Sequence, residues 1–107
     1  MNLEYDPEAY VEALEAADWY ERKVRGLGGR FATEWKRVEN DVLNRPEFYR
    51  CQYGPVRACH FRVFPYRLLY RIKDGNLIQV LAVMHDARKP GYWAPVVTSH
   101  TGCSMIP

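Results

Sequence analysis

Two histidines and several arginines in the second half of the chain are residue types that can act on a phosphate group. His60 can serve as a general base or acid, and His85 is a second titratable side chain, close in sequence to Arg88. Arg62 and Arg67, with Arg88, can hold phosphate oxygens and stabilise the charge that a phosphate gains in a transition state. These residue types are the ones that cleavage of RNA requires.

Aromatic residues and further cations accompany this set. Tyr92 and Trp93 can stack on an unpaired base. The remaining candidates for contact with a target are cationic: Arg57, Arg71, Lys73 and Lys89. A structural explanation stays open for each of them, because sheet arginines commonly lay their stems over apolar surface, and His85 can be a hydrogen-bonded residue at a strand end.

Charge is distributed unevenly along the 107 residues, although the net charge is only +2. Residues 1–47 hold 11 of the 13 acidic residues against 7 Lys and Arg, a balance of −4, whereas residues 48–107 have a balance of +6. No Asp or Glu occurs from Arg50 to Lys73. A chain of this kind can present one cationic surface to an anionic partner while it stays near neutral overall.

Several classes of protein do not fit the sequence. The longest apolar run is far shorter than the roughly 20 residues that span a bilayer, so no membrane association is expected. The N-terminal residues lack a signal-peptide pattern, so we expect a cytoplasmic location. Three cysteines without C-x-x-C spacing argue against a disulfide framework and a zinc site. We expect no metal and no cofactor.

Three stretches in the second half have the composition of strands: Val56–Phe64, Arg67–Lys73 and Leu77–Met84. Their short, turn-forming connections predict an antiparallel meander, and the apolar third stretch is typical of a central strand covered on both faces. Alternation places Cys59, Phe61 and Val63 with Leu68, Tyr70 and Ile72 on one face. The opposite face then gathers His60 and Arg62 beside Arg67 and Arg71.

The residue pattern in the first half of the sequence predicts two helices. Asp6-Pro7-Glu8 is a helix start, and that helix should run to about Arg25, with an apolar stripe of Tyr10, Leu14, Ala17 and Val24. Gly26, Gly28 and Gly29 should break it. The second helix is expected from about Arg30 to Asn44, with a stripe of Phe31, Trp35, Val38 and Val42.

The expected fold is therefore α+β, with an N-terminal helical hairpin packed on an antiparallel sheet. The sheet consists of the three-stranded meander and a short N-terminal edge strand, Asn2–Tyr5, while Pro46–Pro55 reads as a linker. Residues 1–93 should form a single domain. Residues 94–107 should be a tail, either frayed or added as a strand at a sheet edge.

The order of a cationic strand, the segment FPYRLLYRI, and an apolar strand ending in HDARKPGYW resembles the RelE/ParE superfamily of toxins from bacterial type II toxin–antitoxin modules. The resemblance runs from about Leu3 to Trp93. It implies a compact α+β fold and a cognate antitoxin as partner. It also implies a target that is either DNA gyrase or ribosome-bound mRNA.

The two branches of this superfamily match different features of the chain. In the mRNA-cleaving branch, Arg67 and Arg88 match arginines, and Tyr92 more loosely matches a C-terminal tyrosine, but a pair of strand lysines is replaced by Ala58 and His60. The missing lysines and the ending RKPGYW look more like the gyrase-poisoning branch. We therefore expect a ParE-like gyrase poison; the alternatives are a RelE-like ribosome-dependent mRNA endoribonuclease and an inactive interaction domain.

The expected antitoxin is an acidic, partly disordered protein that folds as it docks, because a cationic surface attracts such a partner. We expect it to contribute an amphipathic helix or a strand that packs on the helical hairpin or on the sheet edge.

Overall fold

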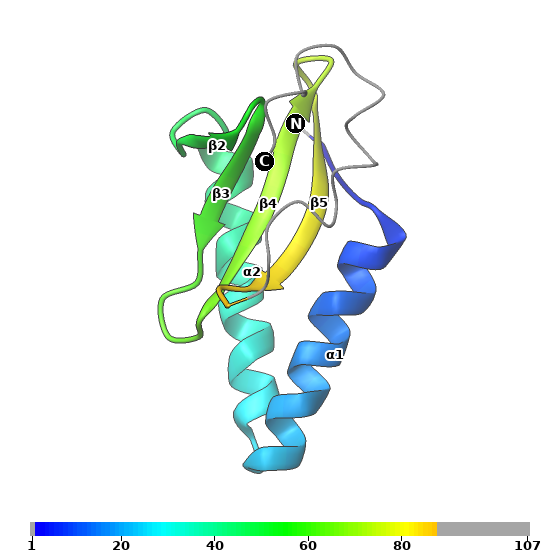
Figure 1. Ribbon diagram of the computed structural model, residues 1–107, viewed down its shortest axis with the longest axis vertical. Coiled ribbons are helices and arrows are strands. Elements are labelled where there is room, and N and C mark those ends of the chain that lie inside the picture. The colour runs from blue at the N-terminus through cyan, green and yellow to red at the C-terminus, as the bar shows by residue number, and fades with distance from the viewer. Residues whose placement is uncertain (1, 88–107) are drawn as a thin grey trace.

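Two helices cover one face of a five-stranded sheet in a computed structural model of the protein, which describes residues 2–87 (Figure 1). The order of elements is β1 (Asn2–Tyr5), α1 (Pro7–Lys23), α2 (Leu27–Asn44), β2 (Cys51–Tyr53), β3 (Val56–His60), β4 (Tyr66–Lys73) and β5 (Leu77–His85). The strands lie in the order β1-β5-β4-β3-β2. The predicted α+β class, with a helical hairpin on a sheet, is confirmed.

The predicted meander is present as β3, β4 and β5, with antiparallel pairing throughout. β5 lies between β1 and β4 and is buried along Ile78–Met84, as predicted for a strand covered on both faces. Two features differ from the prediction. β1 pairs parallel to β5, so the sheet is mixed, and a fifth strand, β2, forms within the expected linker. β2 turns into β3 at Gly54, whose φ of 58° suits glycine.

The first strand of the meander is shorter than predicted. β3 ends at His60, and the chain bends so that the Phe61 N–H donates to the Tyr66 carbonyl at 2.9 Å. As a result Phe64 is buried, while Val63, which was predicted to face the core, is 65% exposed. The strict alternation expected for Val56–Phe64 therefore fails after Phe61.

Helix α1 packs on the sheet with a different face from the one predicted. The buried residues are Ala9, Ala13 and Ala16, whereas Tyr10 and Leu14 are each 47% exposed. Alanines at this spacing lie on one side of a helix and let its backbone approach β5 closely. The predicted stripe of large side chains was wrong because close approach favours small residues there.

The join between the helices also differs from the prediction, because α2 already begins at Leu27. Gly26 takes the left-handed conformation at φ 88°, and the Glu21 carboxylate accepts the backbone N–H groups of Gly26 and Gly28 at 3.0 Å. A Cβ atom on Gly28 would lie 2.6 Å from the Ala17 carbonyl oxygen. Gly28, which was expected in the break after the first helix, therefore lies inside α2 and permits the two helices to cross closely.

The core between the helices and the sheet follows the prediction for α2. Phe31, Val38 and Val42 are fully buried against β-strand residues. Trp35 is only partly buried; its indole N–H donates to the Tyr5 hydroxyl at 2.6 Å, and that hydroxyl donates to the Glu39 carboxylate. Burial, followed by the Glu39 hydrogen bond, raises the pKa of Tyr5, so the phenol stays a neutral donor.

The opposite face of the sheet carries a second buried apolar cluster: Val56, Ala58, Leu69, Leu81, Ala82 and Met84. In Figure 1 α2 passes behind β3 and β4, and α1 lies beside β5. Along β3 and β4 the residues of this second cluster alternate with those of the core under the helices, so they point to the face away from the helices. Among residues 2–87, no helix is both long and apolar enough to cross a membrane.

Candidate functional site

The side chains of His60 and Arg67 lie next to each other at one end of the sheet, on the face away from the helices. They are directly opposed partners of β3 and β4. Arg67 donates from Nη1 to the Gln52 amide oxygen at 3.0 Å, and its Nε lies 3.6 Å from Asp86 Oδ1. We call His60, Arg67, Gln52 and Asp86 the His60–Arg67 site.

The charge of this site is partly balanced by the chain itself. The Arg67 side chain is 15% exposed, and Asp86 neutralises some of its charge. At 3.6 Å the contact to Asp86 is too long for a hydrogen bond, and the buried Nε has no such partner in the part of the chain that the structure describes. Because Nε is buried, an anionic oxygen that approaches beside exposed His60 would meet the outer nitrogens of the guanidinium instead.

Two more predicted cations follow Arg67 along β4 on the same face, because side chains two residues apart share a face. Arg71 is only 8% exposed and donates from Nε to the Gln79 oxygen at 2.7 Å; Gln79 in turn donates to Asp6 Oδ1 at 2.7 Å. Lys73 is half-buried near the β4–β5 turn. Arg71 thus joins β4, β5 and the start of α1, and the predicted cationic face is narrower than the sequence suggested.

His85 lies on the other face of the sheet from His60. It pairs with Tyr66, whereas the partner of Arg67 is Met84, so alternation points His60 and His85 in opposite directions. The His85 Nδ1 accepts the Ala87 N–H at 2.9 Å, and its ring meets the Tyr66 ring edge-on at 5.2 Å. The structure does not bring the two histidines together as an acid–base pair.

Arg57 and Arg62 are also apart from the His60–Arg67 site. Arg57 lies opposite Tyr70 and donates to the carbonyls of Tyr49 at 2.6 Å and Glu47 at 3.2 Å, so it anchors the segment before β2. Arg62 has an exposed side chain in the β3–β4 loop. Its backbone N–H donates to the Glu34 carboxylate.

Glu34 fastens the β3–β4 loop to α2. Its carboxylate accepts the Arg37 Nε at 2.9 Å and the Arg37 Nη2 at 2.8 Å. Hydrogen bonds from Arg37, and then from the Arg62 backbone, lower the pKa of Glu34 to about 2 despite burial. The Glu34 carboxylate therefore stays ionised at neutral pH, and the contact should weaken only as the pH falls toward the pKa of Glu34.

Four predicted site residues, Arg88, Lys89, Tyr92 and Trp93, lie outside the described residues, as does the predicted tail 94–107. The proposed roles of those residues stay predictions. Within residues 2–87, no three His, Cys, Asp or Glu side chains converge to hold a metal ion.

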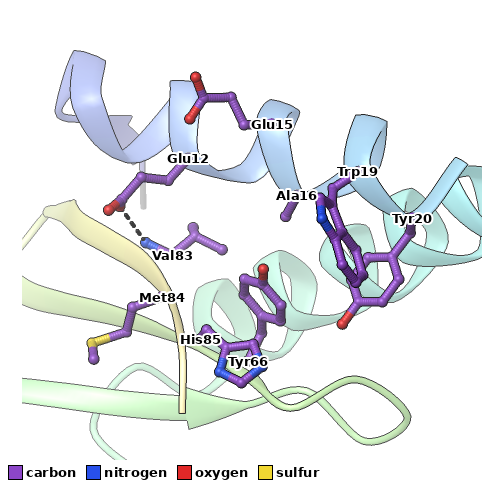
Figure 2. A pocket seen from close by; sticks show the side chains of 9 residues that line it. All are labelled: Glu12, Glu15, Ala16, Trp19, Tyr20, Tyr66, Val83, Met84 and His85. Atoms are coloured by element: carbon purple, nitrogen blue, oxygen red, sulfur yellow. Dashed lines mark hydrogen bonds between the residues drawn. The ribbon is translucent and has the colours of Figure 1, made fainter. Parts of the chain in front are cut away.

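Sequence reasoning missed a groove between α1 and β5, with a volume of about 360 Å³ (Figure 2). Its lining is aromatic and acidic, and includes Glu12, Glu15, Trp19, Tyr20 and Tyr66. Burial raises the pKa of both tyrosines, so their phenols remain neutral. One signal was present in the sequence, because Trp19 falls away from the apolar stripe expected for its helix.

A comparison with protein families matches most of the chain to one family, and a comparison with solved structures finds a similar fold. A family model described as the ParE toxin of type II toxin–antitoxin system, parDE, matches residues 3–90. A solved structure titled "Chromosomal ParDE TA system from P. aeruginosa" is similar in fold, with a TM-score of 0.59 and 18% sequence identity. The likeness covers 79% of this chain and 95% of that chain. No curated protein sequence matches.

Proposed function

Because the chain belongs to the ParE toxin family of type II toxin–antitoxin systems, we propose that it inhibits growth by binding and poisoning DNA gyrase. Inhibition by binding requires a shaped surface that carries charge, and it requires no general base. The His60–Arg67 site would contact the gyrase complex. Four further residues that the sequence predicts to be functional would join this contact: Arg88, Lys89, Tyr92 and Trp93. This target would place the protein in the cytoplasm.

The observation that carries the proposal is the separation of His60 from His85 on opposite faces of the sheet. Cleavage of RNA needs a base for the 2′-hydroxyl and an acid for the leaving oxygen, both within reach of one phosphate. In residues 2–87, His60 is the one histidine on the face that carries Arg67. A cationic surface for binding is thus better supported than a pair of catalytic histidines.

We also propose that a cognate antitoxin neutralises the protein. The similar solved structure is of a ParDE toxin–antitoxin system, and the family that matches is that of ParE toxins from such systems. The uneven charge of the chain favours a partner whose own charges are segregated, because surfaces of opposite charge speed the association of two proteins.

The target is tested by inducing the chain without its antitoxin and following DNA integrity and translation together. Gyrase poisoning predicts DNA breaks while translation is initially intact, and purified gyrase should accumulate cleaved DNA when the chain is added. Early loss of translation with cleaved transcripts would contradict gyrase as target and favour ribosome-dependent cleavage of mRNA. No effect on growth would identify an inactive interaction domain.

A matched pair of variants tests the site. Arg67→Gln should restore growth, because it removes the guanidinium but keeps a polar side chain beside His60. Arg22→Gln is the control, since the Arg22 side chain is 71% exposed on α1 and pairs only with Asp18 among the described residues. Arg88→Ala should likewise restore growth. Full toxicity of Arg67→Gln and Arg88→Ala at equal soluble expression would refute the assignment.

A further inference from the structure

β5 extends five residues beyond the end of its neighbour β1. The parallel pairing joins Asn2–Tyr5 to Leu77–Val80 and stops there. In residues 2–87, no strand lies beside Leu81–His85 on that side. An edge without a neighbouring strand can offer its backbone groups to another strand.

The orientation of the backbone along this edge is known from two hydrogen bonds. The Val83 N–H donates to Glu12 Oε1 at 3.1 Å, toward α1, and the Asp86 N–H donates to the Pro65 carbonyl at 2.8 Å, toward the β4 side. Because N–H directions alternate along a strand, the N–H of His85 points to the same side as that of Val83. Both groups face the groove between α1 and β5 that Figure 2 shows.

The groove is suited to a peptide that carries a basic side chain. Trp19, Tyr20 and Tyr66 give it aromatic walls, and Glu15 lies at its rim on α1 (Figure 2). Within the chain, the ammonium of Lys23 already lies 5.0 Å from the Trp19 ring centroid, a cation–π contact. Trp19 is 50% exposed, so a second cation can reach this aromatic and acidic surface.

We propose that an extended segment of the antitoxin adds to the Leu81–His85 edge of β5 in this groove, as a continuation of β1, and places a Lys or Arg side chain against Glu15 and Trp19. The main chain would bond to the edge at Val83 and His85, while alternate side chains enter the groove. A strand at Val83 takes over the N–H that Glu12 now holds. This proposal rests on the antitoxin partner proposed above.

Charge complementarity is the reason for choosing a basic segment. α1 carries five acidic residues against Arg22 and Lys23, and two of these acids, Glu12 and Glu15, line the groove. An acidic antitoxin segment, as the sequence predicted for the cationic sheet, would be repelled here. The acidic groove and the cationic face of the sheet would therefore bind different segments of the same antitoxin.

The test measures the affinity of the full chain for the antitoxin encoded beside its gene, using two matched pairs of variants. Glu15→Lys should weaken binding at least fivefold, while Asp18→Lys, the same charge change three residues on and outside the groove lining, should stay within twofold. Trp19→Ala should weaken binding at least tenfold. Phe48→Ala, which removes a 66% exposed aromatic ring elsewhere, should stay within twofold.

Amide hydrogen exchange in the complex distinguishes strand addition from other modes of docking. Slower exchange of the Val83 and His85 amides supports the proposal. Unchanged affinity of Glu15→Lys and Trp19→Ala, or protection confined to the outer face of α1 around Val11 and Leu14, would overturn it and leave the antitoxin as partner. If the unaltered chain does not bind the antitoxin at all, the proposed antitoxin partner fails as well.

Discussion

The two helices lie on the same face of the sheet, but they bury side chains of very different size. α2 buries an aromatic ring and two valines in the core, whereas the buried residues of α1 are alanines and its Tyr20 is only partly buried against Phe31. The fully buried residues are Phe31, Val38 and Val42 in α2, and Ala9 and Ala13, with nearly buried Ala16, in α1. α1 can therefore lie close to β5, while Tyr10, Val11 and Leu14 stay about half exposed.

This difference indicates a division of roles. α1 leaves Tyr10, Val11, Leu14 and Trp19 exposed by 47–50% each, with Tyr10 beside Trp35 and Trp19 in the groove beside β5. Exposed apolar residues grouped on one element are typical of an interaction surface. Large buried side chains are thus concentrated in α2, and exposed apolar side chains are concentrated in α1.

The largest loss of stability is expected when the buried aromatic ring of α2 is removed. Phe31 is fully buried, and its ring centroid lies 5.1–5.6 Å from those of four other aromatic rings: Tyr20, Phe61, Phe64 and Tyr66. Phe31→Ala should lower the free energy of unfolding by about 3–5 kcal/mol, because it leaves a cavity among these rings. Urea unfolding followed by circular dichroism measures the change.

Leu14→Ala on α1 is the matched control. Its side chain is half exposed, so the loss should be below about 0.5 kcal/mol, with a small compensation from the helix propensity of alanine. Equal losses for the two variants would mean that α1 contributes to the core as much as α2 does.

The same contrast explains which parts of the fold could be predicted from the sequence. Large apolar residues at helical spacing correctly identified the buried face of α2, because volume and hydrophobicity coincide there. In α1 the equally regular series beginning at Tyr10 is outside, and the alanines are inside. Periodicity alone cannot tell a small-residue contact from a large-residue face; that choice is set by the distance between backbones.

For the candidate site, local pairing was predictable and longer-range placement was not. Alternation correctly placed His60 beside Arg67, since this depends on two adjacent strands. It misplaced Arg62, because β3 ends before that residue. Gln52 belongs to a strand of three residues, too short for any pattern, and the groove at Trp19 depends on where β1 stops. These features arise from tertiary contacts rather than from residue spacing.

A smaller loss of stability is expected when a polar contact of α2 is removed. Glu34→Gln should lower the free energy of unfolding by about 2 kcal/mol at pH 7, because hydrogen bonds from Arg37 and the Arg62 backbone lose their charged acceptor. The pKa of Glu34 falls from its ordinary value of 4.5 to about 2 on folding. The unfolded chain thus binds more protons in that window, so this stabilisation is complete above about pH 4.5 and is lost as the pH falls toward 2.

Urea midpoints measured from pH 7 to pH 2 check this prediction. The unaltered chain should lose its advantage over Glu34→Gln between pH 4.5 and 2. Parallel curves over the whole range would show that the carboxylate does not hold the β3–β4 loop to α2.

The smallest effect concerns the crossing where α1 and α2 come together. Gly28→Ala should lower the free energy of unfolding by about 1–2 kcal/mol: the added Cβ would lie 2.6 Å from the Ala17 carbonyl oxygen and 2.8 Å from Glu21 Cβ, which costs more than helix propensity returns. Gly29→Ala is the adjacent control, because its Cβ would meet nothing within 4 Å. That variant should gain up to about 1 kcal/mol. If both alanines stabilise the chain equally in urea unfolding, α1 and α2 do not need the close contact at Gly28.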